Sequence, residues 1–478
     1  MREHSTTVGP AGPRRSSSSA IVFEYDAGTL VLRRVPPGFD PSAYPDLTWD
    51  PRVGVFRAAG YRYAALVANL RRAGWTVQDA IHKSADRHRF GWKPFDLRSY
   101  QSDALWAWRR AGRRGLVCLP TGSGKTRVGL AAMAAGGLAT LVLVPTKVLL
   151  AQWAEAIRAL YEGPIGQVGD GQKRVEFVTL CTFESAYRHL ERFGDRFGLL
   201  IVDEVHHFGG GLRSEALEMA PAPSRLGLTG TPPADRDNDG RLARIERLVG
   251  PVVYEMNVVD LAGSFLSDFE TVVLPVSLTP AESLEYERNN ARFLGEYRTF
   301  RAGNLNGTWP EFIAWSRSRP RGLEAVSAWH RNQALLSLPA AKRALLADLL
   351  LRHRRHKVLV FTRDNQAAYG ISSEHLIPAV TCDVGRSERT QILSAFKAGR
   401  VRALVSSRVL NEGVDVPEAD VAIIVGGALG TREYLQRVGR VLRQGDGKRA
   451  KIYELVVGRS GEAKRARGHA ASLTRGRR

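Results

Sequence analysis

The chain has 478 residues, of which 69 are Lys or Arg and 48 are Asp or Glu, giving a net charge of +21 at pH 7. This length is too great for one hydrophobic core, so we expect roughly two to four domains. No run of about 18 apolar residues occurs, which argues against a membrane-spanning helix. The three cysteines are too few and too widely spaced for a disulfide framework, and they fit a reducing cytosol. The positive charge favours nucleic acid as a partner over a basic surface that is merely well solvated.

The N-terminal part predicts a disordered segment followed by a small mixed α+β domain. Residues 1–19 are rich in Ser, Arg, Pro and Gly and lack the apolar core of a secretory signal. The domain is expected at residues 20–92, with a hairpin of strands 21–25 and 29–32, a turn at 49–52 and a helix at 61–73. Aromatic and basic residues interleave here, so the aromatics either stack on nucleic-acid bases or form the core of the domain.

A glycine-rich segment at residues 119–126 predicts a phosphate-binding loop. It lies between an apolar strand and a helical pattern, so backbone N–H groups and a helix N-terminus can hold phosphate oxygens. Lys125 would reach the outer phosphates and Thr126 would hold Mg²⁺. The usual first glycine is Leu119 here, which makes the loop a variant, and an ordinary Gly/Ser loop is the alternative. The candidate loop residues are Leu119, Pro120, Thr121, Gly122, Ser123, Gly124, Lys125 and Thr126.

Strands and helices alternate from residue 115 to about residue 258. Continuous apolar runs between amphipathic helices predict a buried parallel sheet with helices on both faces. Ligands bind beyond the carboxyl ends of the strands in such sheets. The expected strands are residues 115–118, 140–144, 176–180, 199–202 and 225–229.

An acidic pair follows the fourth of these strands. Asp203 would hold Mg²⁺ through water, and Glu204 would orient or deprotonate the attacking water. Two adjacent carboxylates at the end of a buried strand are costly unless a cation balances them; a solvated acidic turn is the alternative. His206 belongs to the same motif. Zinc is not expected there, because adjacent histidines cannot easily face one ion and no cysteine lies nearby.

The alternation of strands and helices stops at residues 282–338, which are helix-rich, basic and aromatic. This segment is longer than a normal connection, so we expect an inserted helical element. A second α/β unit follows. Its expected elements are strands 357–361, 377–381, 402–405, 421–425 and 452–456 and a helix at 389–399. In the helical segment 434–443, Arg440 and Arg443 share a face with Gln436; they are either arginine fingers for a γ-phosphate or a plain surface arginine face. The tail at 459–478 predicts a disordered basic arm.

The order of these motifs is more specific than any one of them. A glutamine, the phosphate loop, Asp-Glu-x-His, Thr-Gly-Thr and a second-sheet Gln-x-x-Gly-Arg-x-x-Arg resemble the superfamily 2 helicases and translocases. Within that superfamily the chain is similar to the xeroderma pigmentosum group B (XPB) helicase family in its short archaeal and bacterial form. The phrases that carry this resemblance are Phe23-Glu24-Tyr25-Asp26, Trp49-Asp50-Pro51-Arg52, Leu97-Arg98-x-Tyr100-Gln101, Asp203-Glu204-Val205-His206-His207 and Arg432-Glu433-Tyr434-x-Gln436-Arg437.

The resemblance implies an α/β fold with two RecA-like parallel-sheet domains, at residues 93–258 and 259–458. It also implies a thumb-like helical insertion at about 282–338 and a damage-recognition-like domain at 20–92. The implied activity is ATP- and Mg²⁺-dependent 3′–5′ unwinding of single-stranded or forked DNA in repair, with a nuclease as a possible partner and no membrane. We expect a cytoplasmic, nucleoid-associated protein of a prokaryote.

The resemblance also assigns residues. Gln101 and Arg98 would contact adenine, Gly413 and Asp415 would contact the nucleotide from the second domain, and Arg440 and Arg443 would stabilise the transferring phosphoryl group. The implied nucleic-acid contacts are Pro145, Thr146, Thr182, Arg236, Thr362, Arg363 and Ser406.

Two departures and three alternatives accompany this assignment. Asp235-Arg236-Asp237 stands near where the family has an Arg-Glu-Asp loop, and Thr-Gly-Thr replaces Thr-Ala-Thr. The alternatives are an RNA helicase with the same ATPase motifs, a duplex DNA translocase that does not unwind, and an ATP-driven scaffold for a nuclease.

Overall fold

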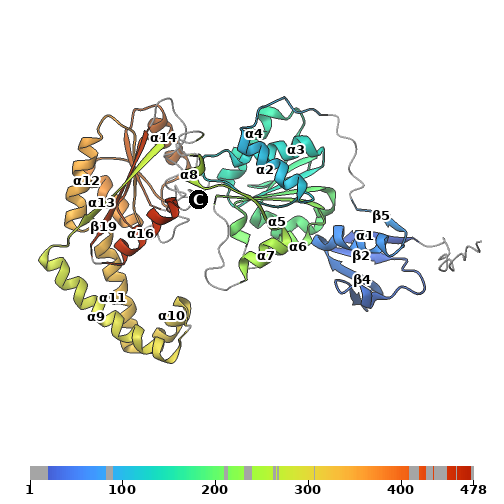
Figure 1. Ribbon diagram of the computed structural model, residues 1–478, viewed down its shortest axis with the longest axis horizontal. Coiled ribbons are helices and arrows are strands. Elements are labelled where there is room, and N and C mark those ends of the chain that lie inside the picture. Colours follow the sequence, from blue (N-terminus) through green and yellow to red (C-terminus); the bar gives the residue numbers. More distant parts are fainter. Residues whose placement is uncertain are drawn as a thin grey trace, which may run out of the picture.

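The computed structural model describes residues 20–81, 90–208, 214–230, 240–261, 265, 268–305, 307–407, 419–426, 434, 449–458 and 460–474. Three sheets follow one another along this part of the chain. A small N-terminal sheet lies at one end of the molecule, two larger α/β units follow, and a helical arm extends from the second (Figure 1). Within the described ranges, no helix combines the length and apolarity needed to cross a membrane.

The N-terminal domain is a five-stranded mixed sheet in the order β3-β4-β2-β1-β5 with helix α1 on one face. The elements are β1 (Ile21–Asp26), β2 (Thr29–Arg33), β3 (Thr48–Asp50), β4 (Val55–Ala59), α1 (Tyr63–Arg72) and β5 (Val77–Asp79). The antiparallel β1–β2 pair confirms the predicted hairpin, and α1 confirms the predicted helix. The predicted turn at 49–52 is partly wrong, since Trp49 and Asp50 pair within β3 and the turn begins at Pro51. Most of the aromatics, including Phe56, Tyr63 and Trp75, pack in the core of this domain.

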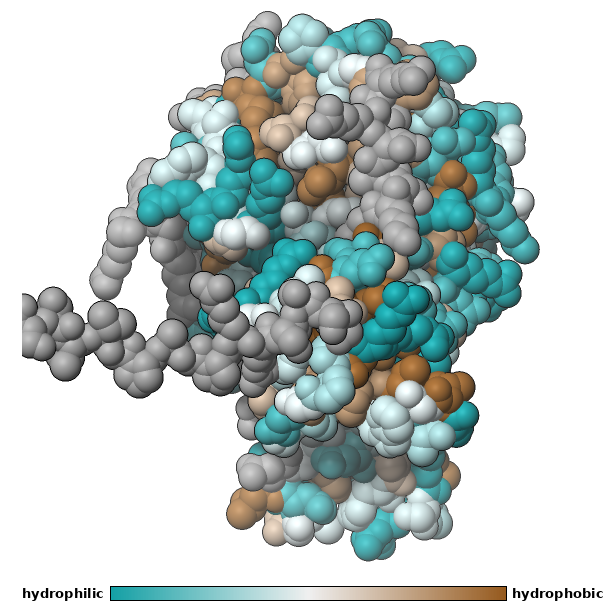
Figure 2. Space-filling model, turned by 90° about the vertical axis from the view of Figure 1, so that its right-hand side faces the viewer, coloured by the Kyte–Doolittle hydropathy of each residue, from teal (hydrophilic) through white to brown (hydrophobic). Residues whose placement is uncertain are grey.

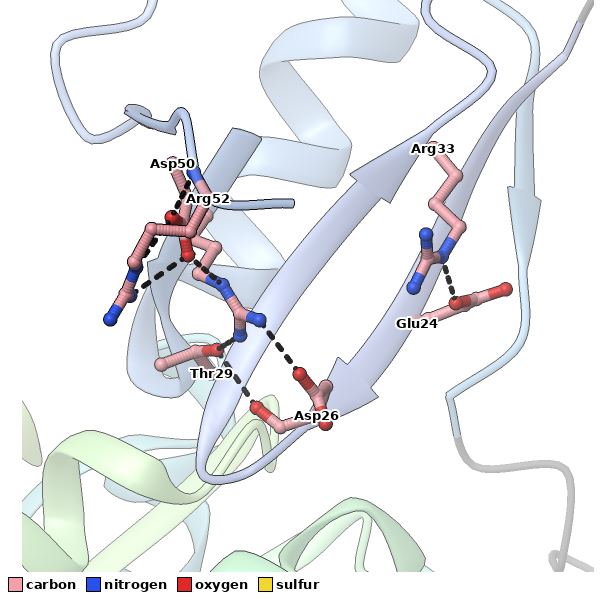
Figure 3. Close-up of polar contacts among 7 residues, drawn as sticks. Glu24, Asp26, Thr29, Arg33, Asp50 and Arg52 are labelled. Atoms are coloured by element: carbon pink, nitrogen blue, oxygen red, sulfur yellow. Dashed lines mark hydrogen bonds and ion pairs between the residues drawn. The ribbon is translucent and has the colours of Figure 1, made fainter. Parts of the chain in front are cut away.

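The opposite face of this sheet carries a network of ion pairs (Figure 3). Arg57 donates to Asp50 at 3.0 Å, to Thr29 at 2.8 Å and to Asp26 at 2.8 Å. Arg52 forms a second pair with Asp50 at 2.9 Å, and its hydrogen bonds hold the pKa of that carboxyl at about 2. Arg57 therefore links its own strand, β4, to residues of β1, β2 and β3.

The N-terminal domain rests on the first large unit through two glycines. Gly28 has a φ of 83°, and a Cβ there would lie 2.8 Å from the side chain of Met219. A Cβ at Gly60 would lie 2.1 Å from the Met219 carbonyl oxygen. Tyr25 adds a hydrogen bond from its hydroxyl to the Leu190 carbonyl at 3.1 Å. This close approach of backbone to helix α6 (Glu215–Met219) requires residues without side chains at both positions.

The first large unit is an eight-stranded sheet in the order β13-β6-β12-β11-β7-β10-β8-β9. All neighbours are parallel except β8 and β9. Its strands are β6 (Arg114–Cys118), β7 (Thr140–Val144), β8 (Ile165–Gly169), β9 (Gln172–Arg174), β10 (Val178–Thr182), β11 (Leu199–Asp203), β12 (Ser224–Thr229) and β13 (Val252–Glu255). Its longer helices are α2 (Ser99–Arg110), α3 (Lys125–Gly136), α4 (Lys147–Leu160), α5 (Phe183–His189) and α7 (Arg241–Leu248). The five predicted strands are confirmed, β10 two residues later than expected, while β8, β9 and β13 were not predicted.

A fully buried cation braces this unit. Arg225 of β12 donates to the carbonyls of Ala222 at 3.1 Å, Leu217 at 2.9 Å and Leu248 at 2.7 Å, and also to the Ala220 carbonyl. Burial lowers the pKa of Arg225 well below its ordinary value. Several of these carbonyls lie at the C-terminal ends of α6 and α7, where the helix dipole favours a cation.

The second large unit is a six-stranded parallel sheet in the order β14-β19-β18-β15-β17-β16. Its elements are β14 (Asp268–Val276), α12 (Ala340–Arg352), β15 (Val358–Phe361), α13 (Asn365–His375), β16 (Ala379–Val380), α14 (Arg386–Lys397), β17 (Ala403–Ser406), β18 (Val421–Ile424), β19 (Arg449–Val457) and α16 (Gly461–Thr474). The five predicted strands are confirmed, but β14 was missed because it is a half-exposed edge strand. The predicted disordered arm at 459–478 is wrong over residues 461–474, which form α16.

The predicted insertion is helical, as expected. It consists of α9 (Pro280–Gly303), α10 (Trp309–Arg317) and α11 (Pro320–Ser337). Its aromatic residues pack around buried Phe312, with Phe300 at 5.4 Å and Tyr297 at 5.1 Å between ring centroids. In Figure 1 these helices form the arm that extends from the second sheet.

Candidate functional site

Strand order in the first sheet brings three of the predicted motifs to one edge. β6, β12 and β11 are neighbours, with Cys118 opposite Thr229 and Leu228 opposite Asp203. Because all three strands run in the same direction, the residues after Cys118, Thr229 and Val202 emerge side by side. The phosphate loop, the Thr-Gly-Thr segment and the acidic pair therefore share one site.

The phosphate loop has the backbone that its glycines predict. Gly122 and Gly124 have φ angles of 87° and 79°, in the left-handed region that favours glycine. Helix α3 begins at Lys125, and its N-cap Gly124 makes no side-chain capping hydrogen bond. An uncapped helix N-terminus is suited to an anion. Leu119, the departure from the usual pattern, is fully buried and donates its N–H to the Thr229 carbonyl at 3.0 Å, so this position serves the core.

Two side chains of α2 hydrogen-bond to the backbone of the phosphate loop. The Tyr100 hydroxyl donates to the Ser123 carbonyl at 2.5 Å, and Gln101 Nε2 donates to the same carbonyl at 2.9 Å. Gln101 Oε1 accepts from the Arg98 N–H at 3.0 Å, and the Arg98 guanidinium donates to the Phe265 carbonyl at 3.0 Å. Gln101 is thus tied to the loop, and the adenine contacts of Gln101 and Arg98 stay predictions.

Asp203 ends β11 and is buried, with 5% of its surface exposed. Its Oδ1 accepts from the Glu204 N–H at 2.9 Å, and its Oδ2 accepts from the Trp153 indole N–H at 2.8 Å. Burial, followed by the neighbouring Glu204 carboxylate, raises the pKa of Asp203 above its ordinary value. The φ of Glu204 is 47°, a strained value for a residue with a side chain, and such strain is concentrated at functional sites.

Lys125, Glu204 and His206 converge beside Asp203. Lys125 Nζ lies 4.0 Å from Glu204 Oε1. His206 Nδ1 lies 3.0 Å from Thr229 Oγ1 and 3.5 Å from Glu204 Oε2. That Glu204 oxygen is buried and accepts no hydrogen bond from the residues described.

This donor set fits Mg²⁺. Two carboxylates, one of them with an oxygen that lacks a hydrogen bond among the described residues, lie near Lys125, which directly precedes Thr126 at the start of α3. Hard oxygen donors of this kind, together with nucleotide phosphates, are what Mg²⁺ binds in proteins. The raised pKa of Asp203 has the same physical origin, since a buried carboxylate pair gains from a cation.

The predicted nucleic-acid contacts of the first domain lie on the other half of the same edge. Strand β7 pairs with β10, placing Val144 opposite Thr182. Thr146 caps α4 by accepting from the Leu149 N–H at 3.2 Å, and Thr182 caps α5 by accepting from the Ser185 N–H at 3.2 Å. Pro145 and Thr146 are partly exposed and Thr182 is buried, so the three residues share one end of the sheet, and only the first two lie at its surface.

In the second domain, Thr362 and Ser406 are buried and bonded to backbone. Thr362 Oγ1 donates to the Asp364 carbonyl at 2.9 Å and Ser406 Oγ donates to the Val380 carbonyl at 2.8 Å. Arg363 is partly exposed, donates to Gln333 of α11 and lies 5.7 Å from the Trp329 ring. A pocket of about 520 Å³ opens at this point between α11 and the strand ends; it is lined by His330, Gln333, Ala334, Arg363, Asp364, Asn365, Cys382 and Ser407.

Six predicted site residues lie outside the described residues. They are Arg236, Gly413, Asp415, Gln436, Arg440 and Arg443.

Three residues of the site were missed as ligands or supports. Tyr100 holds the phosphate loop, Thr229 contacts His206, and Trp153 holds Asp203. Tyr100 and Thr229 stand inside motifs that the sequence had marked. Trp153 carries no such signal, because an apolar helix face that includes a tryptophan is typical of any core helix.

Comparison with known proteins agrees with this geometry. Residues 23–81 match the family described as the xeroderma pigmentosum group B helicase damage recognition domain. The "DNA 3'-5' translocase XPB2" of Sulfurisphaera tokodaii is 35% identical over 415 residues, covering 86% of this chain and 93% of that protein. The chain belongs to the XPB helicase family. Its two large domains match the type III restriction enzyme res subunit family at 94–234 and the helicase conserved C-terminal domain at 341–445.

Longer relatives share the same core. The "DNA 3'-5' helicase XPB" of Mycobacterium tuberculosis is 30% identical, and the match covers 81% of this chain and 66% of that protein. The "Putative DNA 3'-5' helicase Rad25" of Halobacterium salinarum is 30% identical over 81% of this chain and 59% of that protein. Among solved structures, the Pyrococcus furiosus Hef helicase domain superposes with a TM-score of 0.50 at 18% identity, covering 78% of this chain and 98% of that one. That likeness shows the fold alone, and the two helicase family matches at 94–234 and 341–445 imply use of ATP.

Proposed function

We propose that this XPB-family chain is an ATP- and Mg²⁺-dependent DNA helicase that moves in the 3′–5′ direction during DNA repair. The observation that carries the proposal is the convergence of Lys125, Asp203 and Glu204 beside an uncapped helix N-terminus. The relatives named as DNA 3'-5' translocase and helicase supply the substrate and direction.

The residues of the site divide the chemistry between them. The phosphate loop and Lys125 bind and neutralise the outer phosphates, and Glu204 accepts the proton of the attacking water. Asp203 and Thr126 would hold Mg²⁺, which when bound would neutralise charge that develops on the phosphates. Arg440 and Arg443 would complete the site from the second domain, and closure of the two domains around ATP would move them along a DNA strand.

The DNA track would combine Pro145, Thr146 and Thr182 with Thr362, Arg363 and Ser406, and Arg236 would lie near the strand junction. Contacts of this kind go to phosphates and are independent of sequence. Figure 2 shows the end of the molecule that carries the N-terminal domain, where hydrophilic residues surround several hydrophobic patches. The net charge of +21 supports the same partner.

The deciding experiment measures ATP hydrolysis without nucleic acid, with single-stranded DNA, with forked DNA and with RNA. Strong stimulation by DNA and not by RNA is the expected result. Equal stimulation by RNA would overturn the DNA assignment. Binding to single-stranded DNA should weaken as salt is added. The logarithm of the binding constant should fall against the logarithm of the salt concentration with a slope of about −0.7 per phosphate contact. A binding constant that does not change with salt would contradict a track that contacts phosphates.

A duplex translocase is the second candidate, since the relative from Sulfurisphaera tokodaii bears that name. A helicase would separate the strands of forked DNA. A translocase would displace a third strand that is bound to a blunt duplex, but it would leave the two strands of the duplex paired. A nuclease partner and a cytoplasmic, nucleoid-associated location stay predictions, and co-purification from the native cell would test the former.

A further inference from the structure

One buried contact in the first domain joins helix α4 to the metal-binding carboxylate. Trp153 has 1% of its surface exposed, and its indole N–H donates to Asp203 Oδ2 at 2.8 Å. The second donor to this carboxylate is the backbone N–H of Glu204, which belongs to the same chain segment as Asp203. Among the residues that the structure describes, Trp153 is therefore the side chain that hydrogen-bonds the carboxylate from a different element of the fold.

Helix α3, which follows the phosphate loop, has a glycine where it packs against the Trp153 indole. Gly129 lies inside α3, where a Cβ would approach the Trp153 ring to 2.6 Å. Glycine weakens a helix interior, so its use at this position has a steric reason. The Trp153 ring thus fits between the phosphate-loop helix and the end of β11.

Helix α4 also carries predicted nucleic-acid contacts. It begins directly after Pro145 and Thr146, and Thr146 is its N-cap. Trp153 follows about two helical turns later on the same helix. A shift of the α4 N-terminus would therefore displace the indole, because a close-packed interior transmits strain.

We propose that Trp153 is a positioning residue that fixes the Asp203 carboxylate for the Mg²⁺–nucleotide complex and couples it to nucleic-acid contact at the start of α4. This inference rests on the proposed ATPase function. Partners of this kind, which orient a metal ligand, commonly change metal affinity when they are removed.

The test replaces Trp153 with Phe, which keeps an aromatic ring and removes the hydrogen bond. The matched control is Trp108→Phe: Trp108 is also buried, and its indole N–H donates to the Arg225 carbonyl at 2.8 Å, away from the site. The first readout is binding of a fluorescent ADP analogue with and without Mg²⁺, which requires no turnover. Trp153→Phe should lower the Mg²⁺-dependent gain in affinity by about 10- to 100-fold, and Trp108→Phe should leave it unchanged.

A second readout tests the coupling. The factor by which single-stranded DNA stimulates ATP hydrolysis should fall several-fold in Trp153→Phe and stay constant in Trp108→Phe. Gly129→Ala provides an independent route to the same defect, because its Cβ displaces the indole while alanine favours the helix.

The outcomes separate the two proposals. If wild-type ATP hydrolysis requires neither Mg²⁺ nor DNA, the proposed function fails, and this inference fails with it. If the wild type hydrolyses ATP with Mg²⁺ but binds the ADP analogue equally well without it, the inference alone is overturned. If the wild type depends on Mg²⁺ and Trp153→Phe matches Trp108→Phe in either readout, the inference alone is overturned. Equal thermal melting of the two Phe variants excludes a general loss of stability as the cause.

Discussion

In each of the two large domains a helix begins after an interior parallel strand, β6 or β15, but the N-termini of these two helices are capped differently. In the first domain, α3 follows β6, and its N-cap Gly124 has a φ of 79° and no capping side chain. In the second, α13 follows β15, and Asp364 caps it by accepting from the Ala367 N–H at 2.8 Å. A carboxylate at the cap satisfies the N–H groups and repels an anion, whereas glycine leaves them for phosphate. We therefore expect the capping residue to determine which of the two similar sheets binds the nucleotide phosphates.

The buried cations show a second difference between these domains. Arg225 in the first is held by carbonyl oxygens alone. Lys342 in the second is fully buried and donates to the Leu336 and Val425 carbonyls and to Glu462 of α16 at 2.8 Å. The first arrangement braces one domain internally, and the second ties the C-terminal helix to the base of the inserted arm.

The largest expected effect comes from removing the cation of the phosphate loop in the first domain. Lys125→Ala should lower the rate of ATP hydrolysis by about 10²–10³-fold or more, because the outer phosphates lose their cation. Binding to single-stranded DNA should survive, as measured by fluorescence anisotropy. Joint loss of hydrolysis and DNA binding would indicate unfolding instead.

Lys342→Met should lower the free energy of unfolding by about 3–5 kcal/mol, because Glu462 is left as an uncompensated buried charge. Urea unfolding measures this loss. Adding Glu462→Gln to the same variant should recover much of it, because the uncompensated charge is then removed. A double variant that recovers no stability would contradict the ion-pair role of Lys342.

Gly124→Ala should weaken ATP binding by about tenfold, since alanine is strained at this φ and its Cβ would lie 2.7 Å from Gln101 Nε2. Gly137→Ala is the matched control: Gly137 ends the same helix with a φ of 56°, and a Cβ there meets nothing within 4 Å. It should lower stability slightly and leave ATP binding intact in calorimetric titration. Equal weakening by both substitutions would show that helix stability, not the loop, controls binding.

The smallest expected effect concerns the capped helix. Asp364→Ala should cost about 0.5–2 kcal/mol of unfolding free energy and leave ATP affinity unchanged, because phosphate binds at the other domain. Asp364→Ser keeps a capping oxygen and should retain most of the stability. A change of ATP affinity in Asp364→Ala would contradict the division of roles between α3 and α13.

The sequence by itself determined the features that depend on neighbouring residues. The turns at Gly122 and Gly124, the apolar strand before Asp203 and the helical insertion follow from local conformational preference and periodicity, which survive without a tertiary structure. The chain order of the motifs identified the family, because it is also a property of the sequence.

Tertiary structure decided the contacts between distant segments. The Trp153–Asp203 hydrogen bond joins residues 50 positions apart, the carbonyls around Arg225 come from two helices, and α16 is held by a lysine 120 positions before Glu462. The half-exposed β14 became a strand only by pairing with β19. Each of these depends on strand order and packing, which amino-acid spacing does not encode, since the same local pattern is compatible with several arrangements in space.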